Sequence, residues 1–297
     1  MTNRRAELLL LSVALIAAVG WILSKMVLSE MEAYTFMSIR FLLAAATLAL
    51  FCGKDIRQLD RNQIFRCLAT GTALGSGLLC WSLGLKLTDK VGEGAFIVSL
   101  GVVVVPLVGR IFFAEKISLL LLVSLIPAVA GLYFLALDNM QQGLGFGFDK
   151  AQYCFLGSIL AFALHLNLSG HYVTSIAPLA LSTLQLGMAG LMATVGALLV
   201  DPPLGQQHGG EIAQLTWVLL IASALVATSL RFSLQTQALQ HLKPSHASMI
   251  LLAEPVLTVL MSMWWLDEVL SGNQIVGCLL IFGGVVFYRL GPVLRRR

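Results

Sequence analysis

Charged residues are scarce in this sequence. Lys, Arg, Asp and Glu make up 11% of its 297 residues, whereas 58% of the residues are hydrophobic. Soluble domains carry roughly a quarter charged residues, so a soluble fold of this length would lack the polar surface to cover so many apolar side chains. The mean hydropathy of +0.88 points the same way. The chain is therefore predicted to be an integral membrane protein, with lipid as the solvent for much of its surface.

Several signatures of enzyme and metal chemistry are also missing. The five cysteines are scattered and form neither a disulfide framework nor a CxxC metal site. The five histidines lack zinc-binding spacings such as HExxH, and no GxxxxGK[ST] loop is present to bind a nucleotide. We therefore expect no metal, no cofactor and no direct use of ATP. The net charge of +4 comes without a basic face or a basic run, so a nucleic-acid partner is not expected.

Long apolar runs are what the sequence has instead. About 20 mostly apolar residues span a bilayer as a helix. Ten runs qualify: 6–28, 33–51, 64–85, 91–114, 117–136, 152–174, 177–200, 214–239, 244–266 and 272–292. The first run, behind Arg4 and Arg5, is similar to a signal peptide, but it lacks a clear cleavage site and continues to Leu28. We interpret it as a retained helix, and the expected fold is all-α with ten transmembrane helices.

The basic residues favour one orientation, because cytoplasmic segments are richer in Lys and Arg than external loops. With the N-terminus inside, the external loops hold only Lys86, Lys90 and Lys150. The inside segments then hold Arg4, Arg5, Lys54, Arg57, Arg61, Arg66, Arg110, Lys116, Lys243, Arg289, Arg295, Arg296 and Arg297. This asymmetry predicts a multi-pass protein of the cell inner (cytoplasmic) membrane, with both termini cytoplasmic.

The two halves of the chain are weakly similar to each other. A shift of 153 residues places 115–118 on 268–271 and Gly131 on Gly284. The expected units are residues 1–140 and 152–297, with five spans each. Since five is an odd number, the second unit would enter the membrane in the opposite sense to the first. Inverted repeats of this kind are a transporter architecture, with the substrate site near the bilayer midplane between the halves.

A series of short motifs follows the same order in each half. The second half carries Leu252-Ala253-Glu254-Pro255-Val256, Asp267-Glu268 and Gly283-Gly284, and the first carries Pro106-Leu107, Glu115-Lys116, Gly131 and, in its second span, Arg40-Phe41-Leu42-Leu43. Together these motifs resemble the drug/metabolite transporter superfamily, in its ten-helix EamA-type branch. The resemblance implies solute transport, often export of metabolites, amino acids or drugs, although importers also belong to the superfamily. The first half departs from the pattern at Gly101-Val102, where the second has Glu254-Pro255.

Three polar residues lie near the middle of predicted spans, where such groups are costly and are usually functional or paired. At ~1.5 Å per residue, Glu254, Arg231 and His165 lie ~15–18 Å from the ends of their spans. All three come from the second half. Their counterparts in the first half are small or apolar: Gly101 and Leu78 at the shift of 153 residues, and Gly20 for His165 at the shift of 145 that fits that part of the chain. We therefore expect the second half to contribute most of the polar part of a substrate site.

Glu254 and Arg231 each allow two interpretations. Glu254 is either a protonatable coupling residue and counter-charge for the substrate or a structural residue beside Pro255. Arg231 shares a helix face with Gln235. It either binds a substrate carboxylate or phosphate or forms a fixed salt bridge with Glu254.

The remaining candidates also have a functional and a structural interpretation. His165, followed by Asn167, is a candidate proton relay or hydrogen-bonding group for the substrate, or a packed core residue. Trp21 and Trp81 fall near mid-depth and not in the interfacial belt that tryptophan favours. They form either an aromatic wall for a ring or amine, or ordinary packing. Arg40, in the second span, is interpreted as mainly structural.

These features favour a secondary transporter that moves a small polar or amphipathic metabolite, amino-acid-like or drug-like, by alternating access. We expect an exporter, with proton coupling through Glu254 or His165 as one mechanism and facilitated diffusion as the other. An importer or facilitator of the same fold is the alternative. A membrane-embedded enzyme is less favoured, since no GxSxG motif and no paired aspartates in adjacent spans are present; we expect no catalytic residues. The expected partners are the substrate and the lipid bilayer, with the protein a monomer or homodimer.

Overall fold

Helices are the regular secondary structure throughout the part of the chain that the computed structural model describes. The described residues are 3–116, 119–141, 149–209, 212–269, 271–273, 275–277, 279–280, 283–284 and 287. Seven helical segments are long and apolar enough to cross a membrane: Arg4–Leu28, Ala33–Arg57, Arg61–Leu87, Lys150–Tyr172, Pro178–Val200, Gln214–Leu239 and Pro244–Trp265. They match the first three predicted spans and the sixth to ninth, so the prediction of an all-α fold built from long apolar helices is confirmed at this level.

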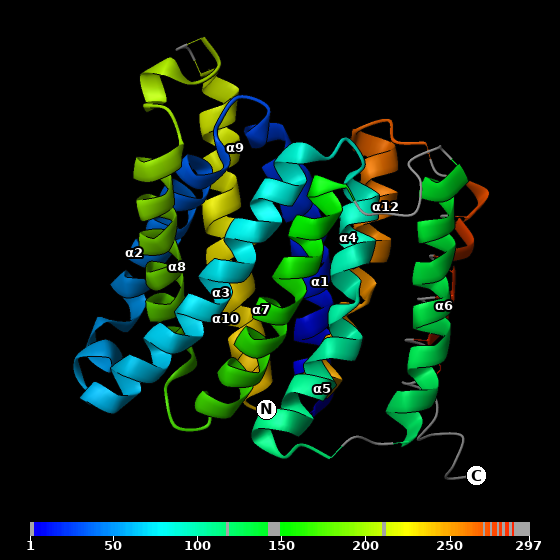
Figure 1. Ribbon diagram of the computed structural model, residues 1–297. Helices are drawn as coiled ribbons and strands as arrows, with labels where there is room; N and C mark the ends of the chain where they lie inside the picture. Colours follow the sequence, from blue (N-terminus) through cyan, green and yellow to red (C-terminus); the bar gives the residue numbers. More distant parts are fainter. Residues whose placement is uncertain are drawn as a thin grey trace.

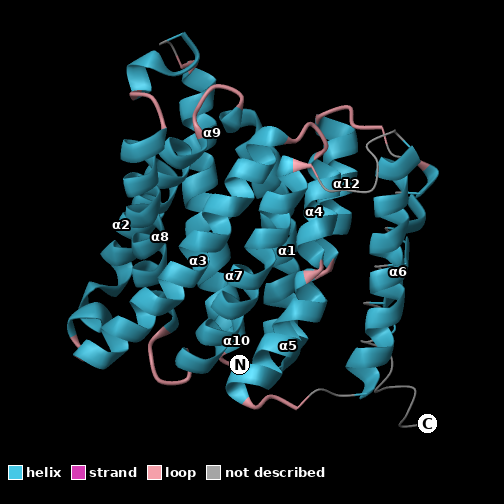
Figure 2. Ribbon diagram, viewed as in Figure 1, coloured by secondary structure: helices cyan, strands magenta, loops and turns pink. Residues whose placement is uncertain are grey.

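The helices stand side by side, with their loops at the two ends of the bundle (Figure 1, Figure 2). In chain order they are α1 (Asn3–Leu28), α2 (Ala33–Arg57), α3 (Arg61–Leu87), α4 (Val91–Ser99), α5 (Gly101–Phe113), α6 (Leu119–Gln141), α7 (Lys150–Tyr172), α8 (Pro178–Val200), η1 (Leu204–Gly209), α9 (Gln214–Ala224), η2 (Leu225–Leu230), α10 (Arg231–Leu239), α11 (Pro244–Leu251) and α12 (Ala253–Trp265). The fifth predicted span corresponds to α6. The tenth, 272–292, lies largely outside the described residues.

The fourth and ninth predicted spans are broken in the middle. The fourth is divided into α4 and α5 at Leu100, and the ninth into α11 and α12 at Leu252. Pro255 lies in the first turn of α12, where its missing N–H would have no intrahelical partner in any case. Gly101 begins α5, and glycine has a low helix propensity. Hydropathy gives each of these spans as one uninterrupted run, because a break of this kind leaves hydropathy unchanged.

The eighth predicted span contains a third irregularity, between α9 and α10. Here the helix widens into the π-helical turn η2. The hydroxyls of Thr228 and Ser229 donate to carbonyls five residues earlier, those of Ser223 and Ala224, at 2.9 and 3.0 Å. A π turn shifts the register of the residues that follow it. The turn η2 therefore helps to decide which side chains of α10 face inward.

The two broken helices end in the same way. Ala114, after α5, and Asp267, after α12, have positive φ angles of 52° and 53°. At each end a backbone hydrogen bond spans six residues: Glu115 N–H donates to the Gly109 carbonyl at 3.0 Å, and Glu268 N–H donates to the Ser262 carbonyl at 3.3 Å. A left-handed residue with such a bond is a common helix C-terminus. Every residue in this comparison is related to its counterpart by the 153-residue shift found in the sequence.

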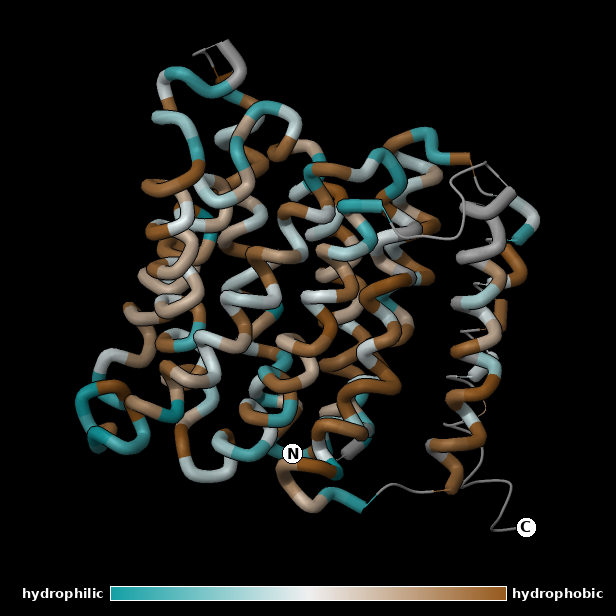
Figure 3. Tube along the Cα trace, viewed as in Figure 1, coloured by the Kyte–Doolittle hydropathy of each residue, from teal (hydrophilic) through white to brown (hydrophobic). Residues whose placement is uncertain are grey.

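Packing brings the two breaks together in the bundle. Helix α4 packs on α12 and α5 packs on α11, so each part of one broken helix contacts the opposite part of the other. Helix α1 packs against α9 to α12, while α2 packs on α8 and α3 packs on α7 and α8. Hydrophilic residues gather toward the two ends of the bundle and apolar residues line its length (Figure 3), as lipid requires. Phe65 and Leu199, for example, are 70% and 79% exposed.

Candidate functional site

A cavity of about 170 Å³ lies where the broken helices meet. Its lining comes from α1, α2, α3, α4, α5, α7, α10, α11 and α12, and includes Gly101 at the start of α5 and Leu252 at the second break. A cavity that holds a single water molecule has a volume of roughly 10–15 Å³, so this cavity is large enough for a small solute. Six of the seven candidate residues from the sequence line this cavity: Trp21, Trp81, His165, Arg231, Gln235 and Glu254.

Glu254 is held from two sides. The indole Nε1 of Trp21 donates to its Oε1 at 2.9 Å, and a terminal nitrogen of Arg231 lies 3.4 Å from its Oε2. The side chains of Arg231 and Glu254 remain 20% and 17% exposed. The predicted salt bridge is therefore present, but as a single long contact and not the bidentate pair that would be strongest. The Nε of Arg231 has no hydrogen-bond partner among the described residues, so the guanidinium keeps donors for another group.

His165 and Gln235 bring further unsatisfied polar atoms to the cavity. Both side chains are at least nine-tenths buried, and neither ring nitrogen of His165 nor the Oε1 of Gln235 has a hydrogen-bond partner among the described residues. The backbone of Thr70 lies near the imidazole, but no bond of acceptable geometry forms. Buried polar atoms are nearly always paired. Because their residues also line the cavity, these unsatisfied atoms make His165 and Gln235 candidates for contact with a solute.

Aromatic side chains form one part of the apolar lining. The rings of Trp21 and Trp81 meet edge to face with centroids 4.9 Å apart, and Phe155 lies 5.9 Å from Trp21. On the other side, the guanidinium of Arg231 lies 5.0 Å from the centroid of the Phe232 ring. Both tryptophans are buried. They therefore pack against the core and line the cavity at once, and the two interpretations of these residues do not exclude each other.

Arg40 is a cavity residue that the sequence interpretation did not assign to the site. It is 5% exposed and lines the cavity from α2. Its Nε donates to the Thr228 hydroxyl at 2.6 Å and one terminal nitrogen donates to the Ser24 hydroxyl at 2.7 Å. The other terminal nitrogen makes a longer bond, 3.4 Å, to the Ala227 carbonyl. The first half therefore contributes a charged group, contrary to the expected concentration of polar groups in the second.

The comparisons with known proteins agree over almost the whole chain. The model of the EamA-like transporter family matches residues 4–137 and again residues 150–290. The chain belongs to the EamA-like transporter family. It is thus a multi-pass membrane transporter of the drug/metabolite transporter superfamily, as its motifs predicted.

Relatives and solved structures support the same assignment. The "Uncharacterized transporter YoaV" of Bacillus subtilis (strain 168) is 22% identical over 282 residues, 93% of this chain and 94% of its own. An "Uncharacterized transporter" of Archaeoglobus fulgidus is 26% identical over 285 residues, 96% of this chain and 86% of its own. One crystal structure, 15% identical, covers 99% of both chains with a TM-score of 0.73. That likeness concerns the fold alone.

Asn167 is the candidate that this EamA-like transporter does not place in the cavity lining. Its side-chain amide donates to the carbonyls of Val105 and Ala163, at 2.9 and 2.8 Å. It therefore connects α7 to α5, on the C-terminal side of the break at Leu100. Sequence position alone suggested a place beside His165, but residues two apart on a helix point in different directions.

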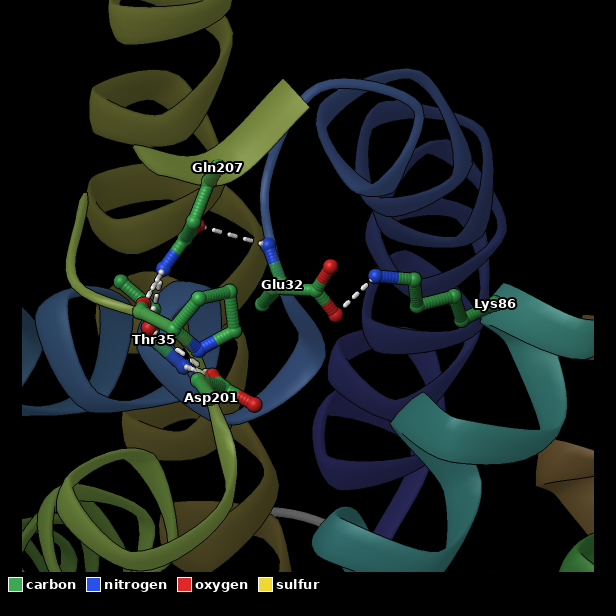
Figure 4. A network of polar contacts seen from close by, with 6 residues as sticks. Glu32, Thr35, Lys86, Asp201 and Gln207 are labelled. Carbon is green, nitrogen blue, oxygen red and sulfur yellow. Dashed lines mark hydrogen bonds and ion pairs between the residues drawn. The ribbon is translucent and has the colours of Figure 1, made fainter. Parts of the chain in front are cut away.

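A network of polar contacts lies at the end of the transporter at which α2 begins (Figure 4). The N–H and hydroxyl of Thr35 donate to Asp201 at 2.7 and 2.8 Å, and the Gln207 amide donates to the Thr35 hydroxyl at 3.0 Å. The N–H of Glu32 donates to Gln207 at 3.0 Å, and Lys86 forms an ion pair with Glu32. These contacts connect the start of α2 with the end of α3, the end of α8 and η1. This end of the bundle is therefore held together by polar groups that water can also satisfy.

Proposed function

We propose that the protein is a secondary transporter that moves a small polar or amphipathic solute, amino-acid-like or drug-like, by alternating access. The observation that carries this proposal is the cavity between the two broken helices, into which a loose ion pair and unsatisfied buried polar atoms converge. Broken helices that meet near the middle of a bundle are a common substrate site in secondary transporters.

The same proposal divides the chain into inverted units, residues 1–140 and 152–297, each with five spans. The breaks at Leu100 and Leu252, the matching left-handed ends at Ala114 and Asp267, and the antiparallel contacts of α4 with α12 and α5 with α11 support it. The family model also matches the chain twice, once in each unit. Rocking of one unit against the other would open the cavity to each side in turn.

Export across the cytoplasmic membrane is the proposed direction, with both termini inside, and import or facilitated diffusion by the same fold is the alternative. In this orientation the network around Thr35 and Asp201 faces outward and has to open for release. Its partly exposed hydrogen bonds suit a gate, because water replaces them at little cost. Glu254 is the proposed coupling residue, since protonation would end its ion pair with Arg231 and free the guanidinium for the substrate.

Transport by the purified protein in liposomes tests this proposal. A panel of labelled amino acids, nucleobases, amines and organic acids should include at least one solute that moves faster than the leak of empty liposomes. Arg231→Ala should abolish that movement in correctly inserted protein, whereas Arg57→Ala, at the exposed end of α2, should not. Modification of a lipid or peptide without movement of any solute would favour the membrane-enzyme interpretation. Unimpaired transport by Arg231→Ala would remove Arg231 from the site.

A further inference from the structure

We propose that the solute is an organic anion, whose acidic group is bound between Arg40 and Arg231 and whose apolar body lies against the tryptophans. This inference rests on the proposed function and names the substrate class of the same cavity. Among the described side chains that line the cavity, the ionisable ones are Arg40, Arg231, Glu254 and His165.

With both arginines charged, the cavity is positive in every protonation state of Glu254 and His165. With Glu254 ionised and His165 neutral, two arginines face one carboxylate, and one positive charge remains unbalanced. Protonation of either Glu254 or His165 adds to the excess. A zwitterion would leave this excess uncompensated, and a cation would increase it. An anion balances it, and unbalanced charge is costly in a site of low polarity.

Arg40 is the source of the excess. Every hydrogen-bond partner of its guanidinium is neutral: the hydroxyls of Thr228 and Ser24 and the carbonyl of Ala227. The rings of Phe36 and Phe41 lie 5.5 Å from its central carbon. Aromatic faces attract a cation but do not neutralise it. A buried cation ordinarily has a counter-ion, and the described residues place no carboxylate within ion-pair distance of Arg40.

Space for the counter-ion lies on the first-half side of the cavity. Gly20 lines the cavity beside Arg40, but a side-chain carbon placed there would lie 2.9 Å from the Cβ of Ala227, so this part of the lining is already filled. Gly101 has no other atom within 4 Å of the position of such a carbon, so the start of α5 borders open space.

The start of α5 adds to the positive potential. Helix N-termini carry a partial positive charge. The first turn of α12 contains Glu254, which offsets this charge, whereas the first turn of α5 contains no acidic residue. His165, whose ring nitrogens have no hydrogen-bond partner among the described residues, lines the same cavity and carries an N–H donor. Arginine, a helix start and an N–H donor are the usual chemistry of carboxylate binding.

Three solutes with the same ring test the charge preference. Indole-3-acetate, tryptophan and tryptamine carry one indole and are an anion, a zwitterion and a cation at neutral pH. Binding is measured as thermal stabilisation of the full-length protein in detergent, and uptake is measured in liposomes. The anion should be preferred over both others by at least about ten-fold. Equal or better binding of tryptophan or tryptamine, or no binding of any organic acid in the panel, would overturn the inference.

Two sets of variants give the inference a matched internal control. Gly101→Glu adds a carboxylate in open space and should shift preference toward tryptophan and tryptamine by about ten-fold relative to the isosteric Gly101→Gln, which fills the same space without a charge. Arg40→Gln should lose the preference and Arg40→Lys should retain part of it. If Gly101→Glu leaves the preference unchanged, charge does not select the solute. If no solute in the wider panel is transported, the proposed function is wrong. The binding measurements then test the preference for an anion by themselves.

Discussion

The two broken helices share a geometry and differ in chemistry. Both are interrupted at a leucine, and both end in a left-handed residue followed by a backbone hydrogen bond that spans six residues. After the break, α5 presents Gly101 to the cavity, whereas α12 presents Glu254 and Pro255. The glycine is not needed for a positive φ, so its effect at the cavity is to leave space. The shared frame therefore builds the cavity, and the unequal residues on it decide which solute the cavity accepts.

The largest expected effect comes from removing the charge that α12 has and α5 lacks. Glu254→Gln keeps the shape of the side chain and an acceptor for the Trp21 indole, but it loses attraction for Arg231. We expect transport to fall about 100-fold, equivalent to ~2.7 kcal/mol. Liposome uptake under matched insertion measures this change. Glu7→Gln, a glutamate of α1 outside the cavity lining, is the control. Wild-type transport by Glu254→Gln would show that the carboxylate is structural.

The comparison of α3 with its counterpart α9–η2–α10 leads to the second prediction. Helix α3 is continuous, whereas the π turn places the Thr228 hydroxyl where it accepts from Arg40 and donates to the Ser223 carbonyl. Thr228→Val keeps the shape and removes both bonds in a buried position. The free energy of unfolding should fall by ~2 kcal/mol, and by only ~1 kcal/mol for Ser229→Ala, which touches no charge. Equal losses in denaturant titrations would show that Arg40 does not depend on the π turn.

The sequence predicted the seven long spans because their existence depends on local hydropathy alone. The constant rise per residue placed His165, Arg231 and Glu254 at a similar distance from the ends of their spans, and all three line one cavity. It did not predict the direction in which each side chain points. Arg40 was read as structural although it lines the cavity, and Asn167 was placed in the site although it binds backbone carbonyls of α5 and α7. Direction depends on helix packing and on the register shift at η2, which are properties of the folded chain.

The third prediction concerns the contacts between the two halves at the end where α2 begins. Asp201, after α8, accepts both the N–H and the hydroxyl of Thr35 on α2. Asp201→Ala removes a charged acceptor, but the site is partly exposed, so we expect a loss of only ~1.5 kcal/mol of unfolding free energy. Thermal melts in detergent measure the loss. Asp55→Ala, an exposed aspartate of α2, is the control and should change the melts little; the same loss in both variants would count against a specific tie.

The smallest effect compares the two left-handed helix ends directly. Ala114 and Asp267 have nearly the same φ, but alanine pays a steric cost there that aspartate largely avoids by local hydrogen bonding. Ala114→Gly should therefore stabilise the protein by ~0.5 kcal/mol, after the entropy that glycine adds to the unfolded chain. Asp267→Gly should be close to neutral, and Ala46→Gly, in the regular part of α2, should destabilise by ~1 kcal/mol. A gain at Ala114 without one at Asp267 would show that the two ends share a backbone shape and that the residue chosen at each end sets its stability. Equal gains would mean that aspartate is as strained as alanine, and the chemical difference between the halves would then be confined to the cavity.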